Sequence, residues 1–384
     1  MHQTPLASQL LAPRTHIASA SNPFHKATIC FFVGILSFVC GLSAQQSPLA
    51  SIVGRVLDDS TSVPLSNVNV FVANTTLGGS TDANGRFEIR NIPLGSYEIV
   101  ASLLGYSVYL SRVVVKESGT KTIEIRLKPT SLEVSEVLIS APDPSDWRRQ
   151  LQKFKDLFLG TTPFSKQCTL VNGEFLDFEE NAPVSFAAIA RTPLRIENFA
   201  LGYHIDFVLT SFNVLNEVMT IEGLPKYTEM KPPNEAEARR WKENRMRAFR
   251  GSMRHFFTCL FKKELAKNGF AVQALGSLRL DQQAMARKIV TEDEILQYRS
   301  ANYKTVSFTG YIEVEYAGEV DPGFNLMSRS RAFGQVSWLS LNTYSITITD
   351  RGLISESFPT KTYGYWSWKR LADALPLDFE PEQE

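Results

Sequence analysis

The fold of the first part of this chain is decided by the stretch Gly79-Ser80-Thr81-Asp82-Ala83-Asn84-Gly85-Arg86-Phe87-Glu88-Ile89. A polar run enters an Asp-Ala-Asn-Gly turn and leaves it as an alternating pattern with Phe87 and Ile89 on one face. Asn-Gly between two strand-like runs is a strong hairpin signal, because both residues tolerate positive φ. Asp82, Asn84 and Gly85 are therefore predicted to be structural turn residues. They superficially resemble a calcium loop, but the later carboxylate of a twelve-residue loop is absent.

Short alternating runs surround this turn on both sides. They are Ile52–Val56, Val68–Val72, Tyr97–Ala101 after the turn Pro93-Leu94-Gly95-Ser96, and Ile123–Leu127. Roughly seven short strands at a spacing of about ten residues predict a seven-stranded antiparallel β-sandwich. We expect it to occupy residues 50–129.

Five blocks in this region carry a family resemblance. They are Val53-Gly54-Arg55-Val56, Pro64-Leu65-Ser66-Asn67-Val68-Asn69-Val70, Thr81–Phe87, Leu94-Gly95-Ser96-Tyr97 and Leu104-Gly105-Tyr106. In this order they resemble the carboxypeptidase regulatory-like domain, a transthyretin-like or prealbumin-like sandwich with a carbohydrate-binding-like fold. Such domains are common in Bacteroidetes exported proteins, including TonB-dependent receptors. The resemblance implies a fold and a cell-envelope compartment, and it implies no chemistry, since the family name records an accessory domain.

The N-terminus reads as a signal peptide over residues 1–44. Lys26 precedes an apolar run, Ala27 to Leu42, and Leu42-Ser43-Ala44 offers small residues for cleavage. The run is short for a membrane span, which needs about 20 residues, but retention as an anchor stays open. The whole chain has a formal charge of +0, and removal of the signal leaves about −2. That balance gives no global attraction to nucleic acid, so we expect an exported protein of the periplasm or outer membrane.

A second domain is expected over residues 146–384, after a linker at 130–145 marked by Pro142 and Pro144. A helix capped by Asp146 should end at Gly160, and a capping box at Asn234 should open a helix to about residue 267 with Gly251 as its weak point. Strand-like runs fill most of the rest, notably 168–171, 184–189, 203–209, 307–316, 335–341 and 344–349. The chain is therefore predicted to be mainly β, and α+β overall. No function attaches to this second domain.

The residues for a catalytic site are sparse. After the signal only His204 and His255 remain as histidines, and neither lies in a His-x-x-Glu or His-Glu-x-x-His pattern that places zinc ligands on one helix face. No serine nucleophile elbow and no phosphate-binding loop occur. We therefore expect no enzyme, no cofactor and no metal site.

A set of basic residues and a pair of cysteines each allow two interpretations. The basic residues Arg239, Arg240, Arg247, Arg250 and Arg254 lie on the predicted helix. They predict a solvated face, or alternatively a surface for an anionic partner such as membrane headgroups. Cys168 and Cys259 predict either one disulfide in an oxidising compartment or two buried free thiols.

Three classes of function stay open. The leading one is a non-catalytic cell-envelope protein, an interaction module for a protein or glycan partner of unknown identity. The rivals are a peptidase-associated or hydrolytic envelope enzyme, and a structural subunit of an outer-membrane complex. A cleft gathering His204 or Asp206 with shifted pKa values would favour the enzyme, and an exposed apolar patch would favour a partner.

Overall fold

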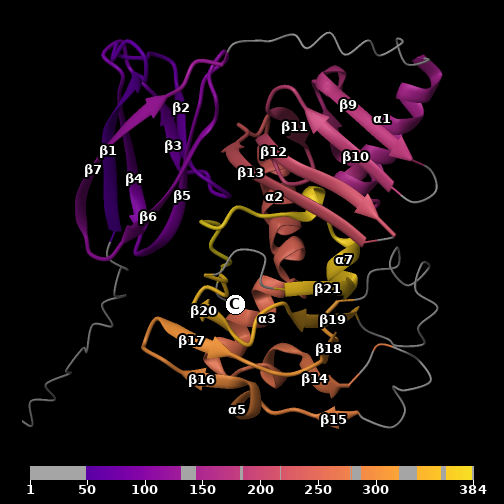
Figure 1. The fold of residues 1–384 in the computed structure, drawn as a ribbon. Helices are drawn as coiled ribbons and strands as arrows, with labels where there is room; N and C mark the ends of the chain where they lie inside the picture. The colour runs from indigo at the N-terminus through magenta and orange to yellow at the C-terminus, as the bar shows by residue number, and fades with distance from the viewer. Residues whose placement is uncertain are drawn as a thin grey trace, which may run out of the picture. The chain divides into compact units, whose positions relative to one another are not determined.

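The computed structural model describes residues 49–130, 144–181, 185–216, 218–276, 278, 287–319, 335–355 and 360–382 (Figure 1). The predicted signal peptide and most of the predicted linker lie outside these residues. The described chain is mostly β, with a few helices after residue 143, as the sequence predicts. No helix among the described residues is long and apolar enough to cross a membrane.

The N-terminal region is a two-sheet sandwich of seven strands. They are β1 (Leu49–Asp58), β2 (Asn69–Val72), β3 (Gly78–Ser80), β4 (Arg86–Pro93), β5 (Gly95–Ser102), β6 (Tyr109–Val115) and β7 (Gly119–Leu127). One sheet has the order β4-β1-β7 and the other β3-β2-β5-β6. Alternate side chains point inward from both sheets, and Phe87 and Ile89 lie in the core between them. The period-two pattern therefore predicted the buried face correctly.

One pairing in the sandwich departs from the predicted antiparallel arrangement. β1 and β7 run parallel, with Ala50 opposite Gly119 and Asp58 opposite Leu127. Alternation along a strand identifies its buried face but says nothing about the direction of its partner. The two strands come from opposite ends of the sandwich sequence, so their pairing is a purely tertiary feature.

The next part of the chain is an antiparallel sheet covered by a helix. It contains α1 (Pro144–Phe158), β8 (Cys168–Leu170), β9 (Leu176–Asn181), β10 (Ser185–Ala190), β11 (Leu194–Asn198), β12 (Tyr203–Leu215) and β13 (Val218–Glu229). The sheet order is β8-β11-β12-β10-β9, and β13 pairs with the other side of β12. Phe154 and Phe158 of α1 pack against Phe212 and Phe207 of β12, with ring centroids 4.8 and 4.9 Å apart. This aromatic contact places α1 on the inner face of the sheet.

The last part surrounds a short apolar helix. Its helices are α2 (Glu235–Phe249), α3 (Met253–Lys262), α5 (Glu292–Ile295) and α7 (Tyr365–Trp368). Its strands are β14 (Phe270–Leu275), β15 (Lys288–Ile289), β16 (Leu296–Tyr298), β17 (Tyr303–Val306), β18 (Tyr311–Tyr316), β19 (Gln335–Leu341), β20 (Ile346–Thr349) and β21 (Thr360–Gly364). They form the sheets β15-β14-β18-β19-β21 and β16-β17-β20. Phe256, Phe257 and Leu260 of α3 are fully buried in this core.

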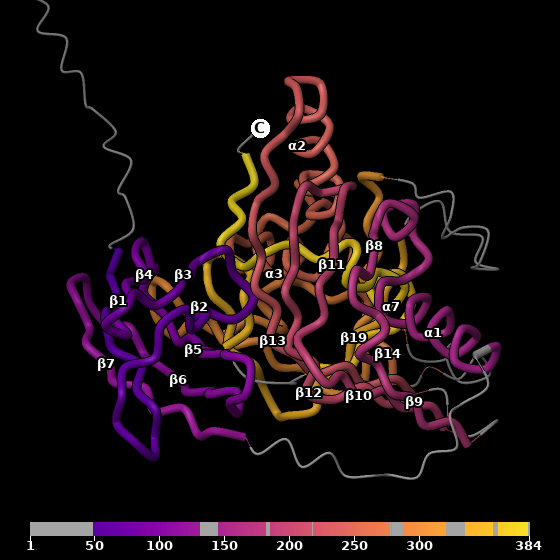
Figure 2. Tube along the Cα trace, turned by 90° about the horizontal axis from the view of Figure 1, so that it is seen from above, coloured from indigo at the N-terminus to yellow at the C-terminus, as the bar shows by residue number. Residues whose placement is uncertain are grey.

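The predicted helix from Asn234 to about residue 267 is two helices. Asn234 caps α2 as predicted, since its side chain accepts a hydrogen bond from the Glu237 N–H over 2.9 Å. The chain then breaks at Gly251, which has φ +67°, and Ser252 caps α3. A Cβ at Gly251 would lie 2.2 Å from Oε1 of Gln335, so a tertiary contact reinforces the break. Figure 2 shows α2 at the top of the view, and Trp241 Nε1 of this helix donates to the carbonyl of Phe199, just after β11, over 2.8 Å.

Candidate functional site

The outer face of the sandwich sheet β2–β5 is buried against strands β12 and β13. Phe71, Ala73 and Val100 form one apolar cluster with Val208 of β12 and Leu224 of β13, and each is at most 9% exposed. Such a face would be solvated in an isolated sandwich with one buried side per sheet. The sandwich is therefore an integral part of the described structure, since Ser47–Glu384 forms one compact unit.

Backbone hydrogen bonds join the same two regions. The Asn74 N–H donates to the Pro225 carbonyl over 2.7 Å, and the Tyr227 N–H donates to the Thr75 carbonyl over 2.9 Å. Thr75 thereby forms a parallel bridge with Lys226 of β13. The loop between β2 and β3 thus acts as a short added strand on the edge of β13.

Charged side chains also lie at the contact between the sandwich and strands β12 and β13. Lys226 Nζ donates to Oδ1 of Asn69 over 2.5 Å, and burial lowers the pKa of Lys226 while Asp206 opposes that shift. Asp206 is the cross-strand neighbour of Lys226 on β12. The ammonium therefore donates to an amide oxygen of the sandwich and lies on the strand opposite a carboxylate.

A cavity of about 730 Å³, here called the edge cavity, lies beside this contact. Its sandwich side includes Tyr97, Glu98, Leu110 and Arg112; its other side includes Phe207, Ile221, Glu222, Gly223, Ile354, Arg370, Leu371 and Leu377. Burial raises the pKa of Tyr97 to about 12, so its phenol stays neutral. The volume falls within the usual range of ligand sites, and the walls combine apolar side chains with a few charged groups.

Gly223 shapes the β13 side of the edge cavity. A Cβ at this position would lie 2.0 Å from Cε1 of Phe207 and 2.7 Å from the Val208 carbonyl oxygen. Only glycine therefore lets the Phe207 ring and the strand approach this closely.

Arg370 is the unusual charged residue of the edge cavity. Its guanidinium makes no hydrogen bond or ion pair with the residues that the structure describes, and burial lowers its pKa. Guanidinium groups in such half-buried positions are normally paired. The sequence does not single out this residue, because Arg370 follows the aromatic run at 363–368 without belonging to any motif.

A second cavity, of about 340 Å³, contains the acid that would favour an enzyme. Asp206 lines it together with Asn69, Phe71, Asn172, Phe175, Arg195 and Val208. His204 is two residues away on the same strand but is an exposed side chain, with its Nδ1 3.8 Å from Oε1 of Glu197. The two groups do not meet in one cleft as a catalytic pair.

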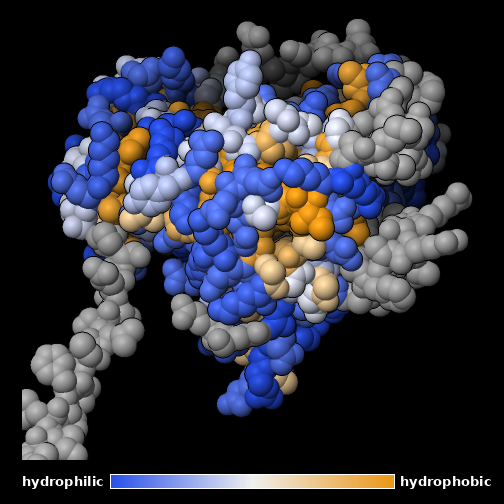
Figure 3. Space-filling view, turned by 90° about the horizontal axis from the view of Figure 1, so that it is seen from below, coloured by the Kyte–Doolittle hydropathy of each residue, from blue (hydrophilic) through white to orange (hydrophobic). Residues whose placement is uncertain are grey.

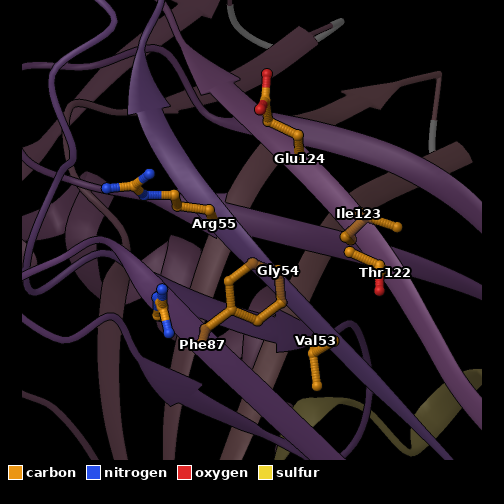
Figure 4. A pocket seen from close by; sticks show the side chains of 8 residues that line it. Val53, Gly54, Arg55, Phe87, Thr122, Ile123 and Glu124 are labelled. Atoms are coloured by element: carbon orange, nitrogen blue, oxygen red, sulfur yellow. The ribbon is translucent and has the colours of Figure 1, made fainter.

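A third cavity, of about 440 Å³, lies on the sandwich sheet β4-β1-β7 (Figure 4). The Phe87 ring lies beside Gly54, while the side chains of Arg55 and Glu124 extend in different directions. A Cβ at Gly54 would lie 2.7 Å from the Phe87 ring, which explains the glycine. The charged groups do not converge, so this cavity offers no evident chemistry.

The predicted turn residues form a tight turn. Oδ1 of Asp82 accepts from the N–H groups of Asn84 and Arg86 over 2.9 and 2.8 Å, and Gly85 has φ +71°. Asn84 does not share that positive φ. The flanking strands β3 and β4 belong to different sheets, so the predicted hairpin is wrong. The turn instead carries the chain from one sheet of the sandwich to the other.

The basic residues do not form one anionic-partner surface. Arg254 is turned inward and donates to the carbonyls of Arg351, Pro376 and Phe379, and burial lowers its pKa to about 10. Arg240 donates to Oε1 of Gln167 over 2.7 Å and to the Phe199 carbonyl over 3.1 Å. These guanidiniums stabilise the fold.

The remaining basic residues lie nearer to solvent. Arg250 is 3.5 Å from Oε1 of Glu319, and Arg239 is 3.8 Å from Oε2 of Glu235. Arg247 is exposed beside the Phe164 ring. The break at Gly251 separates Arg254 from the α2 face, so Arg254 does not share a surface with Arg239 and Arg247.

The two cysteines are free thiols, so the predicted disulfide is not formed. Cys168 packs against the core of the β8–β13 sheet and Cys259 lies in the core around α3. Burial raises their pKa values to about 12 and about 11. Both behave as small apolar residues, which was the alternative interpretation.

The second histidine is also structural. His255 stacks among the rings of Phe249, Phe270 and Tyr316, and its Nδ1 accepts from the Gly251 N–H over 3.1 Å. Burial lowers its pKa to about 4. In the described part of the chain, no group of three or more His, Cys, Asp or Glu side chains is placed to hold a metal ion.

The surface in Figure 3 alternates hydrophobic areas with hydrophilic ones. Several large apolar side chains are exposed, including two groups that the sequence did not single out. Leu215 and Val218 lie at the tip of the β12–β13 hairpin; Val108 lies just before the edge strand β6, and Leu110 and Val114 lie within it. Leu110, which is 50% exposed, belongs both to this edge and to the edge cavity.

The family of the first domain is given by comparison with family models. The model described as CarboxypepD_reg-like domain matches residues 52–139. This segment is a CarboxypepD_reg-like domain. The resemblance predicted from the five sequence blocks is therefore confirmed. The CarboxypepD_reg-like domain is a non-catalytic regulatory fold. No curated protein matches the chain.

The solved structures to which this chain is similar are distant. The minor pilin GBS52 of Streptococcus agalactiae is 17% identical with a TM-score of 0.20, over 22% of this chain and 46% of the pilin. The major pilin subunit BcpA of Bacillus cereus is 17% identical with a TM-score of 0.19, over 22% of this chain and 31% of the pilin. The 3-chlorocatechol 1,2-dioxygenase of Rhodococcus opacus 1CP is 14% identical with a TM-score of 0.19, over 23% of this chain and 62% of the enzyme. Likenesses of this size carry no conclusion about function.

Proposed function

We propose that this chain is a non-catalytic binding protein of the cell envelope, whose CarboxypepD_reg-like domain and second domain together receive a partner. The supporting observation is the edge cavity, which has one wall from each domain. A sandwich that served only as a spacer would need no such shared wall. Its outer face would also not be buried against Val208 and Leu224.

The enzymatic alternative has less support. His204 is exposed, and His255 is enclosed by aromatic rings. Burial raises the pKa values of both cysteine thiols. A nucleophile or a metal-bound water needs partners within hydrogen-bond distance. The described residues do not assemble such a group at either histidine.

Export belongs to the proposal as well. It is supported by the apolar run Ala27 to Leu42 and its small-residue end at Ala44. Cleavage there would release a periplasmic or outer-membrane-associated protein. N-terminal sequencing of the mature protein should begin just after Ala44, and a mature chain that retains residues before Ala27 would contradict export with cleavage.

Site-specific crosslinking tests the binding role. A photoreactive amino acid replaces Leu110, on the edge cavity, and in a matched variant replaces Val63, which is 56% exposed on the sandwich but outside the cavity. In native envelope, the Leu110 variant should give a discrete crosslinked product and the Val63 variant should not. Equal products from both positions, or none from Leu110, would contradict the proposal.

A further inference from the structure

The free edge of β13 is the first observation. Backbone N–H and C=O groups of one residue point to the same side of a strand, and successive residues alternate. Pro225 and Tyr227 use their outward groups to bind the loop at Asn74 and Thr75. Gly223 and Ile221 are the next residues with the same orientation. β13 pairs only with β12 and with this loop among the described strands, so their outward groups have no partner.

The position of that free edge is the second observation. Both Ile221 and Gly223 line the edge cavity. An unpaired strand edge is a template for one more strand, and added strands are a common mode of peptide recognition. Main-chain hydrogen bonds supply affinity in this mode, and pockets for alternate side chains supply specificity.

The opposite walls suit the side chains of such a strand. Leu110 comes from the exposed edge strand of the sandwich, and Ile354, Leu371 and Leu377 come from the C-terminal part of the chain. These apolar groups lie within the same cavity as the strand edge, so an extended segment at the edge of β13 would bury side chains against them.

Arg370 gives the edge cavity a preference for a negatively charged ligand. Its guanidinium has no partner among the described residues, although Glu98 and Glu222 line the same cavity. A carboxylate can accept two parallel hydrogen bonds from a guanidinium, which makes it a favoured ligand for an unpaired arginine. The edge and the arginine together specify a ligand that has a peptide backbone and an acidic group.

Resting on the proposed function, we infer that the edge cavity binds an extended polypeptide segment of the partner. The segment pairs with the outward backbone groups of Ile221 and Gly223, and an aspartate or glutamate side chain or a C-terminal carboxylate of the segment binds Arg370. A glycan would not use the periodic backbone groups of a strand edge in this way.

Peptide selection on the mature chain tests the inference. Random dodecapeptides with a free C-terminal carboxylate are displayed and selected on the immobilised wild-type protein. Enriched sequences should share an acidic residue or depend on the C-terminal carboxylate. Synthetic versions should slow hydrogen exchange in residues 218–224 of β13.

Variants of Arg370 and of a control arginine test whether the Arg370 guanidinium itself binds the peptide. Arg370→Gln should weaken the selected peptides about tenfold or more, as expected for loss of a charge-assisted hydrogen bond. Arg370→Lys should recover part of the affinity, and Arg239→Gln, on the exposed surface of α2, should leave it unchanged. Arg370→Gln should fold normally, because the guanidinium has no partner among the described residues; circular dichroism checks this.

The outcomes distinguish this inference from the broader proposal. If no peptide is enriched, or peptides bind without protecting 218–224 or without sensitivity to Arg370→Gln, the inference is wrong. A crosslink from Leu110 would then still support a partner of different chemistry. If the Leu110 crosslink also fails, the proposed function fails with it.

Discussion

Thr76 and Asp378 are 302 residues apart in the chain and are joined by two hydrogen bonds. The Thr76 N–H donates to Oδ1 of Asp378 over 2.9 Å, and the Thr76 hydroxyl donates to Oδ2. Beside them, the Leu377 N–H donates to the Asn74 carbonyl over 2.7 Å. Arg254 of α3 binds the same C-terminal segment through the carbonyls of Pro376 and Phe379. The C-terminal segment therefore ties the β2–β3 loop of the sandwich to the second domain.

Removal of the Asp378 carboxylate should destabilise the contact between the C-terminal segment and the β2–β3 loop. Asp378→Ala loses two hydrogen bonds in a part-buried position and should lower the free energy of unfolding by about 1–3 kcal/mol. Glu380→Gln is the matched control, since its side chain is 79% exposed and lies 3.5 Å from Arg351. It should change stability by less than about 0.5 kcal/mol. Equal urea midpoints for both variants would contradict a structural role for Asp378.

Two glycines with similar φ test the sequence-predicted turn. Gly85 has φ +71°, and a Cβ there would lie 2.5 Å from the Val56 carbonyl oxygen; Gly105 has φ +85° and nothing within 4 Å. Gly105→Ala should cost about 1 kcal/mol from backbone strain alone. Gly85→Ala should cost more, about 2–3 kcal/mol, because strand β1 must also shift. Thermal unfolding of the full mature chain measures both, and equal losses would show that the β1 contact is unimportant.

His255 should make the protein less stable in mild acid. Its pKa is about 4 in the folded chain and 6.5 when unperturbed. Between these values the unfolded chain binds a proton that the folded chain does not, so stability is full above pH 6.5 and falls as pH drops toward 4. The loss between pH 7.5 and pH 5 should be about 2 kcal/mol. Urea unfolding at the two pH values should show this difference shrink in His255→Gln and persist in His204→Gln.

The cysteines should resist alkylation in the folded protein. Burial raises both thiol pKa values far above pH 8, so little thiolate is present for reaction. Iodoacetamide at pH 8 should label neither Cys168 nor Cys259 within minutes, and both should react in urea. Mass spectrometry reads the result. A non-reduced mature chain whose mass is lower by two hydrogens would instead indicate a disulfide.

The mature protein should be neither a zinc protein nor a carboxypeptidase. A catalytic zinc needs three protein ligands and an open position. Elemental analysis should find no stoichiometric zinc, and peptide substrates should keep their C-terminal residues. About one zinc per chain, lost in His204→Ala or His255→Ala, would overturn this expectation.

The sequence predicted correctly those features that depend only on residues close together in the chain. The alternation of Phe87 and Ile89 predicted the buried face of β4, and the run 335–341 matches the bounds of β19. Asn234 was predicted as a helix cap from the glutamate three residues on. Periodicity and capping involve neighbours within about four residues, so they can be read from the sequence.

Long-range partners decided the rest. The parallel pairing of β1 with β7, the assignment of β3 and β4 to different sheets, and the free thiols all depend on residues that only the fold brings together. Arg254 and Arg370 look alike in sequence, yet Arg254 binds three carbonyls, whereas Arg370 lines a cavity and has no partner among the described residues. The sequence by itself determined the sandwich, its family and the shortage of catalytic groups. Only the tertiary structure decided where the candidate site lies, because a site between the sandwich and the later strands is formed by contacts that no local pattern encodes.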